Sequence, residues 1–222
     1  MIHTIPLSPG VTLRCFPDNR FKQAYLSVQF VRQMRREEAA LNALLPAILL
    51  RGCRSCPDLR SITLRLDHLY GAAIGTVTRR IGDYQTTGLS CGFIEDRYAL
   101  QSDAVFAPMA EFIRELLLDP VMENEVFRED FVRSEKKNLI ATIEAQRNDK
   151  RYYASNRMNR LLCQNDSFGI PRLGEVEQVA AITAQSLYPH YQTILRESPV
   201  ELFYVGSAEP ELVAEERDDS TI

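Results

Sequence analysis

The chain has 222 residues, of which 45% are hydrophobic and 25% are charged, and its formal net charge is −4. This length and composition suffice for a folded core and exclude wholesale disorder. The acidic balance disfavours nucleic-acid binding, which needs a basic face to neutralise phosphates. The longest apolar run, residues 43–50, is much shorter than the ~20 residues that span a bilayer. We therefore expect neither nucleic-acid nor membrane partners.

The chain contains five cysteines, an odd number: Cys15, Cys53, Cys56, Cys91 and Cys163. Residues 1–11 lack the charged start and the apolar stretch of a secretory signal. We therefore expect reduced thiols in a cytoplasmic protein. Cys53 and Cys56 form a C-x-x-C pair, but the second pair that a zinc site needs is missing. Free thiols are the favoured interpretation, and redox chemistry or metal capture is the alternative.

The sequence predicts strands in pairs. Hydrophobic residues alternate over 11–16 and over 24–31, and a Pro-Asp-Asn turn signal lies between them. These two strands are expected to form a hairpin. A second hairpin is predicted over 73–81 and 84–93, because the intervening Gly-Asp pair suits a tight two-residue turn.

Most other segments have helical periodicity. Over 37–50 the apolar face is broad, and Pro46 removes one backbone hydrogen bond within it. Further helices are predicted over 59–70, 104–118, 125–146, 151–163 and 175–182, and from about residue 186. In the helix over 151–163, Ala154, Met158 and Leu161 are expected to point inward.

A last strand is predicted over 200–205. Hairpins that are segregated from a run of helices are typical of an α+β domain. We predict a two-layer fold in which a largely antiparallel sheet carries helices on one face. This domain covers residues 1–206, and the acidic, aperiodic residues 207–222 are expected to form a frayed tail.

Motifs for common catalytic sites are absent from the sequence. The three histidines, His3, His68 and His190, lie too far apart for HExxH or HxxEH. Each is interpreted as a surface or partly buried side chain. GxxxxGK[ST], GxGxxG and GxSxG are also missing. On its residues alone, the chain shows no recognisable catalytic site.

Several phrases resemble the insulinase/pitrilysin family of zinc peptidases. They are LNALLPAILLRGCR over 41–54, LDHLYGAAIGTVTRRIGDY over 66–84, residues 119–143, and LYPHYQTILRESPVELFYVG over 187–206. The resemblance is strongest to bacterial members that have lost the zinc motif. It covers nearly the whole chain but only the first of the two similar modules in the usual family unit. It implies a metallopeptidase-like half-module whose acidic tail leads to a second module.

Active members of this family carry HxxEH on the first long helix and a third zinc ligand, a glutamate, on a later helix. Counting back from Arg51-Gly52 puts the two histidine positions at Ala43 and Ala47. The glutamate position falls at Pro46, and the third ligand falls near Thr142. Alanine and proline side chains offer neither a ligand nor a general base. The resemblance therefore implies no catalytic residue, no bound zinc and no other cofactor in this chain.

The family's substrate adds a strand to a sheet edge near the motif helix. The matching segment here consists of Gly75, Thr76, Val77 and Thr78. Unpaired backbone groups on such a strand can hydrogen-bond an extended peptide of any sequence. The alternative is that this segment is half of a covered hairpin.

The resemblance implies a non-catalytic homologue that acts as a substrate-binding or structural partner of an active zinc-bearing relative. One alternative is a scaffold subunit of a larger, non-proteolytic assembly. Another is an unrelated enzyme with a cryptic nucleophile such as Cys53 or a serine. A surface meant for the second module would be apolar, so we also expect the isolated chain to self-associate.

Overall fold

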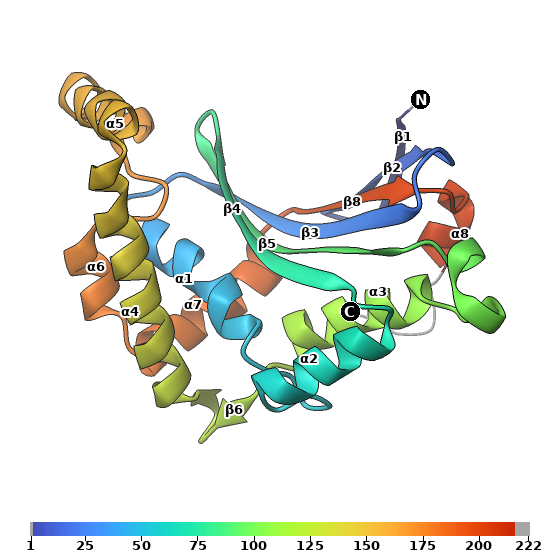
Figure 1. Ribbon diagram of the computed structural model, residues 1–222. Coiled ribbons are helices and arrows are strands. Elements are labelled where there is room, and N and C mark those ends of the chain that lie inside the picture. Colours follow the sequence, from blue (N-terminus) through green and yellow to red (C-terminus); the bar gives the residue numbers. More distant parts are fainter. Residues whose placement is uncertain (1, 216–222) are drawn as a thin grey trace.

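The computed structural model describes residues 2–215 and has two layers (Figure 1). A six-stranded sheet has the order β1-β2-β8-β3-β5-β4, and most helices lie on one side of it (Figure 1). These strands are β1 (His3–Ser8), β2 (Val11–Pro17), β3 (Gln23–Gln33), β4 (Ala73–Ile81), β5 (Tyr84–Ile94) and β8 (Val200–Gly206). Only the β2–β8 pair is parallel, and the other four pairs are antiparallel. The predicted α+β class with a largely antiparallel sheet is confirmed.

The second layer consists mainly of helices. They are α1 (Ala39–Leu49), α2 (Leu59–His68), α3 (Phe106–Leu118), α4 (Glu129–Ala145), α5 (Lys150–Leu162), α6 (Val176–Ala181), α7 (Ala184–Glu197) and α8 (Pro210–Glu215). Single 3-10 turns are η1 (Asp96–Tyr98), η2 (Leu100–Ser102), η3 (Gln146–Asn148) and η4 (Ser167–Gly169). The short strands β6 (Met122–Glu123) and β7 (Val126–Phe127) form a separate hairpin before α4. The core lies between the sheet and α1, α3 and α7, whose inward residues join those of the strands in one cluster.

The predicted hairpin between the first two alternating segments does not form. β8, from the far end of the described chain, lies between β2 and β3: Leu202 pairs with Leu13 on one side and with Val28 on the other. β1, which was not predicted, pairs with β2 at the sheet edge. Alternation shows which face of a strand is buried, but it carries no information about which strand becomes its neighbour.

The predicted β4–β5 hairpin is confirmed, and its turn determines which backbone groups stay free. Gly82 has a φ of +58°, as the first central position of a type II′ turn requires. In a two-residue hairpin the flanking residues, here Ile81 and Tyr84, exchange backbone hydrogen bonds, and bonded pairs then alternate along the ladder. By this alternation, the backbone N–H and C=O groups of Thr76 and Thr78 point away from β5.

Pro46 lies inside α1 without interrupting the helix. Because proline has no N–H, the carbonyl of Asn42, four residues earlier, loses its helical donor. The hydroxyl of Thr87 on β5 donates to that carbonyl at 2.6 Å. At the end of the helix, Leu50 N donates to the Pro46 carbonyl at 3.0 Å. The hydrogen bond that the proline removes is thus replaced by one from the sheet.

The segment after β8 is more ordered than the predicted frayed tail. Ser207 N donates to Glu95 Oε1 at 2.7 Å, and α8 follows. Val213 of α8 is buried in the main core cluster, and α8 packs against β1 and β2. Val213 thus anchors this segment to the core, whereas the acidic, aperiodic sequence of 207–222 predicts fraying. Residues 216–222 lie outside the described part of the chain.

Helix α5 also differs from its prediction. None of its residues is buried: Met158 is 53% exposed, Leu161 is 55% exposed, and Ala154 is exposed as well. The predicted inward face is wrong because α5 projects beyond the sheet and no other layer covers it (Figure 1). Between residues 2 and 215, no helix combines the length and the apolar character needed to cross a bilayer.

Candidate functional site

The positions that the resemblance assigns to the zinc ligands lie on α1 and α4, which pack against each other (Figure 1). Ala43 and Pro46 are buried, whereas Ala47 is half-buried. Thr142 is exposed on α4, and its hydroxyl donates to the Asn138 carbonyl of the same helix at 2.9 Å. The structure brings the two helices together, but three of the four side chains consist of carbon and hydrogen only.

An ion pair fixes how α1 and α4 meet. Arg51 Nη1, just beyond the end of α1, lies 3.1 Å from Glu135 Oε1. The Arg51 guanidinium also lies over the Phe131 ring, 5.0 Å from its centroid. Ala47 precedes Arg51 by one helical turn, and Thr142 follows Glu135 by two turns on the same face of α4. The contact therefore places the end of α1 against the first half of α4.

This arrangement does not fit a zinc ion. A catalytic zinc site needs three protein ligands and an open position for water, and Ala43, Pro46 and Ala47 provide no donor atom. Among the residues that the structure describes, no three His, Cys, Asp or Glu side chains gather in a metal-binding group. No chemical step through a metal follows from this geometry.

A buried chain of polar side chains, which the sequence analysis did not identify, connects α7, α1 and β5. Gln85 Nε2 donates to the carbonyls of Ala39, at 3.1 Å, and Arg172, at 2.6 Å. Because carbonyls can only accept, Gln85 Oε1 must face Asn42, whose Nδ2 donates to it at 2.8 Å. Asn42 Oδ1 is then the acceptor at 2.7 Å from His190 Nε2. This order of donors and acceptors requires a hydrogen on Nε2 of His190.

His190 is held in its neutral form mainly by burial, which lowers its pKa below the usual range. The Glu38 carboxylate opposes this shift, and the Arg32 guanidinium adds to it. The sequence contained one signal for this cluster: Asn42 is a polar residue within the apolar face of the predicted helix over 37–50. Asn42 and Gln85 are each almost completely covered.

The predicted peptide-binding segment lies on β4, an edge strand of the sheet, which within residues 2–215 pairs with β5 alone. Thr76 is exposed, and Val77 is buried on the opposite face of the strand. Arg172 Nη1 donates to the Thr78 carbonyl at 3.0 Å from the free side, as expected for an outward-pointing group. β4 also contacts α1. The edge is therefore open at Thr76 and occupied at Thr78, so the hairpin is covered only in part.

Residues 168–172, which we call the strap, cover the far part of this edge. Arg80 Nη1 donates to the carbonyls of Phe168, at 2.8 Å, and Ile170, at 3.0 Å. The Arg80 guanidinium also lies over the Phe168 ring, 4.6 Å from its centroid. Together with the Arg172–Thr78 contact, these bonds fix the strap on β4 beyond Thr76.

The C-x-x-C pair forms a tight buried turn. Cys53 N donates to the Cys56 carbonyl at 2.9 Å, and Cys56 N donates to the Cys53 carbonyl at 3.1 Å. Burial raises the pKa of the Cys53 thiol, which disfavours the thiolate that a nucleophile needs. All five cysteines are free. The pair has the environment of structural thiols.

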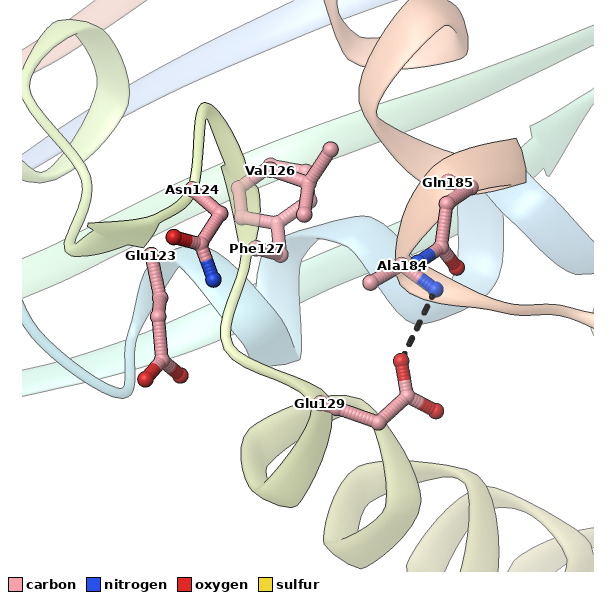
Figure 2. A pocket seen from close by; sticks show the side chains of 7 residues that line it. All are labelled: Glu123, Asn124, Val126, Phe127, Glu129, Ala184 and Gln185. Atoms are coloured by element: carbon pink, nitrogen blue, oxygen red, sulfur yellow. Dashed lines mark hydrogen bonds between the residues drawn. The ribbon is translucent and has the colours of Figure 1, made fainter.

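A recess of about 270 Å³ lies between the β6–β7 hairpin and the start of α7 (Figure 2). Its lining residues are Glu123, Asn124, Val126, Phe127, Glu129, Ala184 and Gln185. Glu129 Oε2 accepts a hydrogen bond from Ala184 N at 3.3 Å, as Figure 2 shows. This carboxylate thus binds a free N–H at the first turn of α7, and the recess contains none of the predicted site residues.

The fold is similar to that of one half of an M16-type peptidase. A conserved protein from Enterococcus faecalis V583 matches with a TM-score of 0.90 and 28% identity over 97% of this chain and 51% of that chain. The peptidase M16 inactive domain from Pseudomonas fluorescens matches with a TM-score of 0.73 over 99% of this chain and 50% of that chain. At 16% identity, the second match shows a shared fold.

In sequence, the chain is similar to the probable inactive metalloprotease YmfF of Bacillus subtilis strain 168. The two are 26% identical over 200 residues, which make up 90% of this chain and 47% of that protein. No protein-family model matches the chain. The chain is thus similar in sequence to a probable inactive metalloprotease and in fold to M16-type peptidase halves, and it spans about half the length of the relatives that it matches. The resemblance to an inactive insulinase-type half-module is confirmed.

Proposed function

We propose that this chain is a non-catalytic half-module that binds extended peptides for an active, zinc-bearing relative. The observation that carries the proposal is the open edge of β4 at Thr76, beside helix α1, where the resemblance assigns the zinc-ligand positions to Ala43 and Ala47. Binding of this kind does not depend on hydrolysis. In such a partnership the relative would supply the zinc ion and this chain a strand template.

The edge of β4 has suitable chemistry for strand addition. The outward N–H and C=O groups of Thr76 can each form one hydrogen bond with an extended peptide, as the alternation from the Gly82 turn indicates. The Thr76 side chain lies on the helix-facing side, because its neighbour Thr78 pairs with Thr87, whose hydroxyl reaches α1. A bound peptide would therefore run along the border between the sheet and α1.

A peptide-binding titration tests this proposal. A fluorescein-labelled peptide of eight Thr and Val residues should raise the fluorescence anisotropy when the protein is added. The same peptide with N-methyl groups at alternate residues should bind much less, because it lacks the backbone donors. Mass spectrometry should show an intact peptide after long incubation with zinc. Hydrolysis with stoichiometric zinc would refute the non-catalytic role.

A matched pair of variants locates the binding site. Thr76→Pro removes an N–H that points away from the ladder, and proline is tolerated at such edge positions. Thr76→Val retains the N–H and the shape of the side chain. We expect the proline variant to lose peptide binding and the valine variant to keep it. Equal binding by both variants would place the peptide elsewhere.

A scaffold role in a larger assembly is the second candidate, and exposed apolar side chains favour it. Leu162 of α5 is 75% exposed, and Leu161 is also largely exposed. Apolar surface of this kind suits a protein interface, whether with the zinc-bearing relative, a second module or a second copy of the chain. Co-purification distinguishes the candidates: a complex that degrades peptides supports the first, and a non-proteolytic complex supports the second.

We also propose a cytoplasmic location. Four of the five free cysteines are buried, and free thiols are typical of reducing compartments. Fractionation of cells that express the untagged protein should recover it with cytoplasmic markers.

A further inference from the structure

The free edge of β4 is short, and it ends at an arginine. The residues of β4 whose backbone N–H and C=O groups point away from β5 are Ile74, Thr76, Thr78 and Arg80. The strap covers the last two, so an added peptide can pair without obstruction only as far as Thr76. Two residues of extended chain span about 7 Å. A peptide paired with Thr76 therefore meets the Arg172 guanidinium one pairing step further along.

We propose that the β4 edge takes extended peptides that carry a carboxylate, and that Arg172 recognises this carboxylate. The inference rests on the proposed peptide-binding function and names the substrate class of the same site. The carboxylate comes either from an acidic side chain or from the C-terminus of the peptide, and the experiment below distinguishes these two sources.

Arg172 is held in a suitable position at both its backbone and its side chain. Its carbonyl accepts from the buried Gln85 Nε2 at 2.6 Å, and its Nη1 donates to the Thr78 carbonyl at 3.0 Å. A guanidinium has five N–H donors in a planar fork, and this contact uses one of them. No ion pair involves Arg172 among the residues that the structure describes. Donors therefore remain for a carboxylate, which arginine can bind with two parallel hydrogen bonds.

The charges around the strap have the sign that an anionic ligand needs. Exposed Arg79 on β4 and exposed Arg151 and Arg157 on α5 form no ion pair in the described part of the chain. Two carboxylates lie nearby, Asp83, which accepts from Ser167 Oγ, and Asp166, which accepts from Phe168 N at 2.7 Å. Both remain charged, but Arg79 and Arg80 of β4 together with Arg172 outnumber them. Although the whole chain is acidic, this end would attract a negatively charged peptide.

Three labelled peptides test the inference with the full chain. The first is the neutral Thr/Val peptide with blocked ends, the second carries one glutamate at successive positions, and the third is neutral with a free C-terminal carboxylate. We expect the second or the third peptide to bind on the order of tenfold more tightly than the first, as one well-placed carboxylate–arginine contact allows. The peptide that gains affinity identifies the source of the carboxylate.

Variants assign this preference to Arg172. Arg172→Gln should abolish the preference and leave binding of the neutral peptide in place. Arg172→Lys keeps the charge but not the fork, so it should keep only part of the preference. Arg60→Gln makes the same charge change at an exposed position on α2 and should have no effect. Melting curves identify any unfolded variant, and Arg172→Lys replaces Arg172→Gln if the latter does not fold.

Two results would overturn the inference while leaving the proposed function intact. One is equal binding of all three peptides by the unmodified chain. The other is a carboxylate preference that persists in full in the Arg172 variants. If no peptide binds the unmodified chain at all, the proposed function itself fails, and the inference fails with it.

Discussion

Helices α1 and α5 have similar lengths, 11 and 13 residues, but very different surroundings. Nine residues of α1 are buried, among them a proline and an asparagine, whereas no residue of α5 is buried. Both helices contain apolar residues at helical spacing. The difference lies in what covers them: α1 is enclosed by β5, β4, α4 and α7, and α5 projects beyond the sheet (Figure 1).

The polar and apolar residues of α1 have different contacts. The positions on α1 that the resemblance assigns to the zinc motif carry Ala43, Pro46 and Ala47, and α1 contacts α4. The polar residue of this helix, Asn42, contacts Gln85 and His190. The side chain of Asn42 thus binds other parts of the fold. Packing and internal hydrogen bonds therefore account for the buried residues of α1.

The largest expected effect is on the α1 core. Leu44 is fully buried, so Leu44→Ala should lower the free energy of unfolding by about 2–5 kcal/mol, through lost burial and a residual cavity. The same change on α5, Leu161→Ala, should alter it by less than about 0.5 kcal/mol. Urea unfolding followed by circular dichroism measures both values. Similar losses at the two positions would mean that α5 is covered in solution.

The next largest effect is expected where the sheet supplies the hydrogen bond that Pro46 removes. Thr87→Val keeps the shape of the side chain but leaves the buried Asn42 carbonyl without its donor. The expected loss in the free energy of unfolding is about 1–3 kcal/mol.

Thr63→Val on α2 is the matched control for Thr87→Val. The Thr63 hydroxyl donates to a carbonyl of its own helix, that of Leu59, and Thr63 is exposed. Its removal should cost less than about 0.5 kcal/mol, because water can replace the bond. If the two valine variants unfold alike, the Thr87 hydroxyl does not compensate for the proline.

How much the sequence predicts depends on whether the pattern is local. The Gly82 turn, the apolar α1 and the two-layer α+β class follow from local spacing and were predicted correctly. The insertion of β8 between β2 and β3 depends on pairing across most of the chain, which alternation does not encode. The sequence predicts that the apolar residues of α5 point inward, because their spacing puts them on one face of the helix. The spacing does not show whether another element packs against that face.

The residues of the candidate site were predicted only where the sequence resembles the insulinase/pitrilysin family. Ala43, Pro46, Ala47 and Thr142 were located by comparison with the family, and the structure places them on two packed helices. The edge position of β4 was implied in the same way. The role of Arg172 in closing that edge was not predicted, because residues 168–172 reach β4 only in the folded chain. The Asn42–Gln85–His190 cluster likewise joins residues from three separate elements.

A smaller effect is expected from the titration of His190. Its pKa is lower in the folded protein than in the unfolded chain, so the unfolded state binds more protons as the pH falls. The contribution of neutral His190 to stability is complete above the unfolded pKa, about 6.5, and decreases as the pH falls through the folded value.

The variant His190→Gln tests the assignment of this pH dependence. A glutamine amide can still donate to Asn42 Oδ1 but does not titrate. Urea unfolding at a series of pH values should therefore give a weaker dependence on pH below 6.5 for the variant than for the unmodified chain. Parallel curves for the two proteins would show that other groups cause the acid sensitivity.

The smallest effect on stability is expected on α5, where the consequence should be for association. Met158 and Leu161 lie three residues apart, on one exposed face of the helix. The double variant Met158→Ser, Leu161→Ser should change the free energy of unfolding by less than about 1 kcal/mol, since each site is exposed. Because exposed apolar patches promote association, light scattering should show self-association of the unmodified chain and a smaller mean mass for the variant.

The control is Asn156→Ser with Asn159→Ser, which changes two half-buried polar residues of the same helix and should leave the mass unchanged. If the unmodified chain is a monodisperse monomer, the exposed face of α5 does not mediate self-association at the concentrations used. The contrast between α1 and α5 would then affect the stability of the fold but not association.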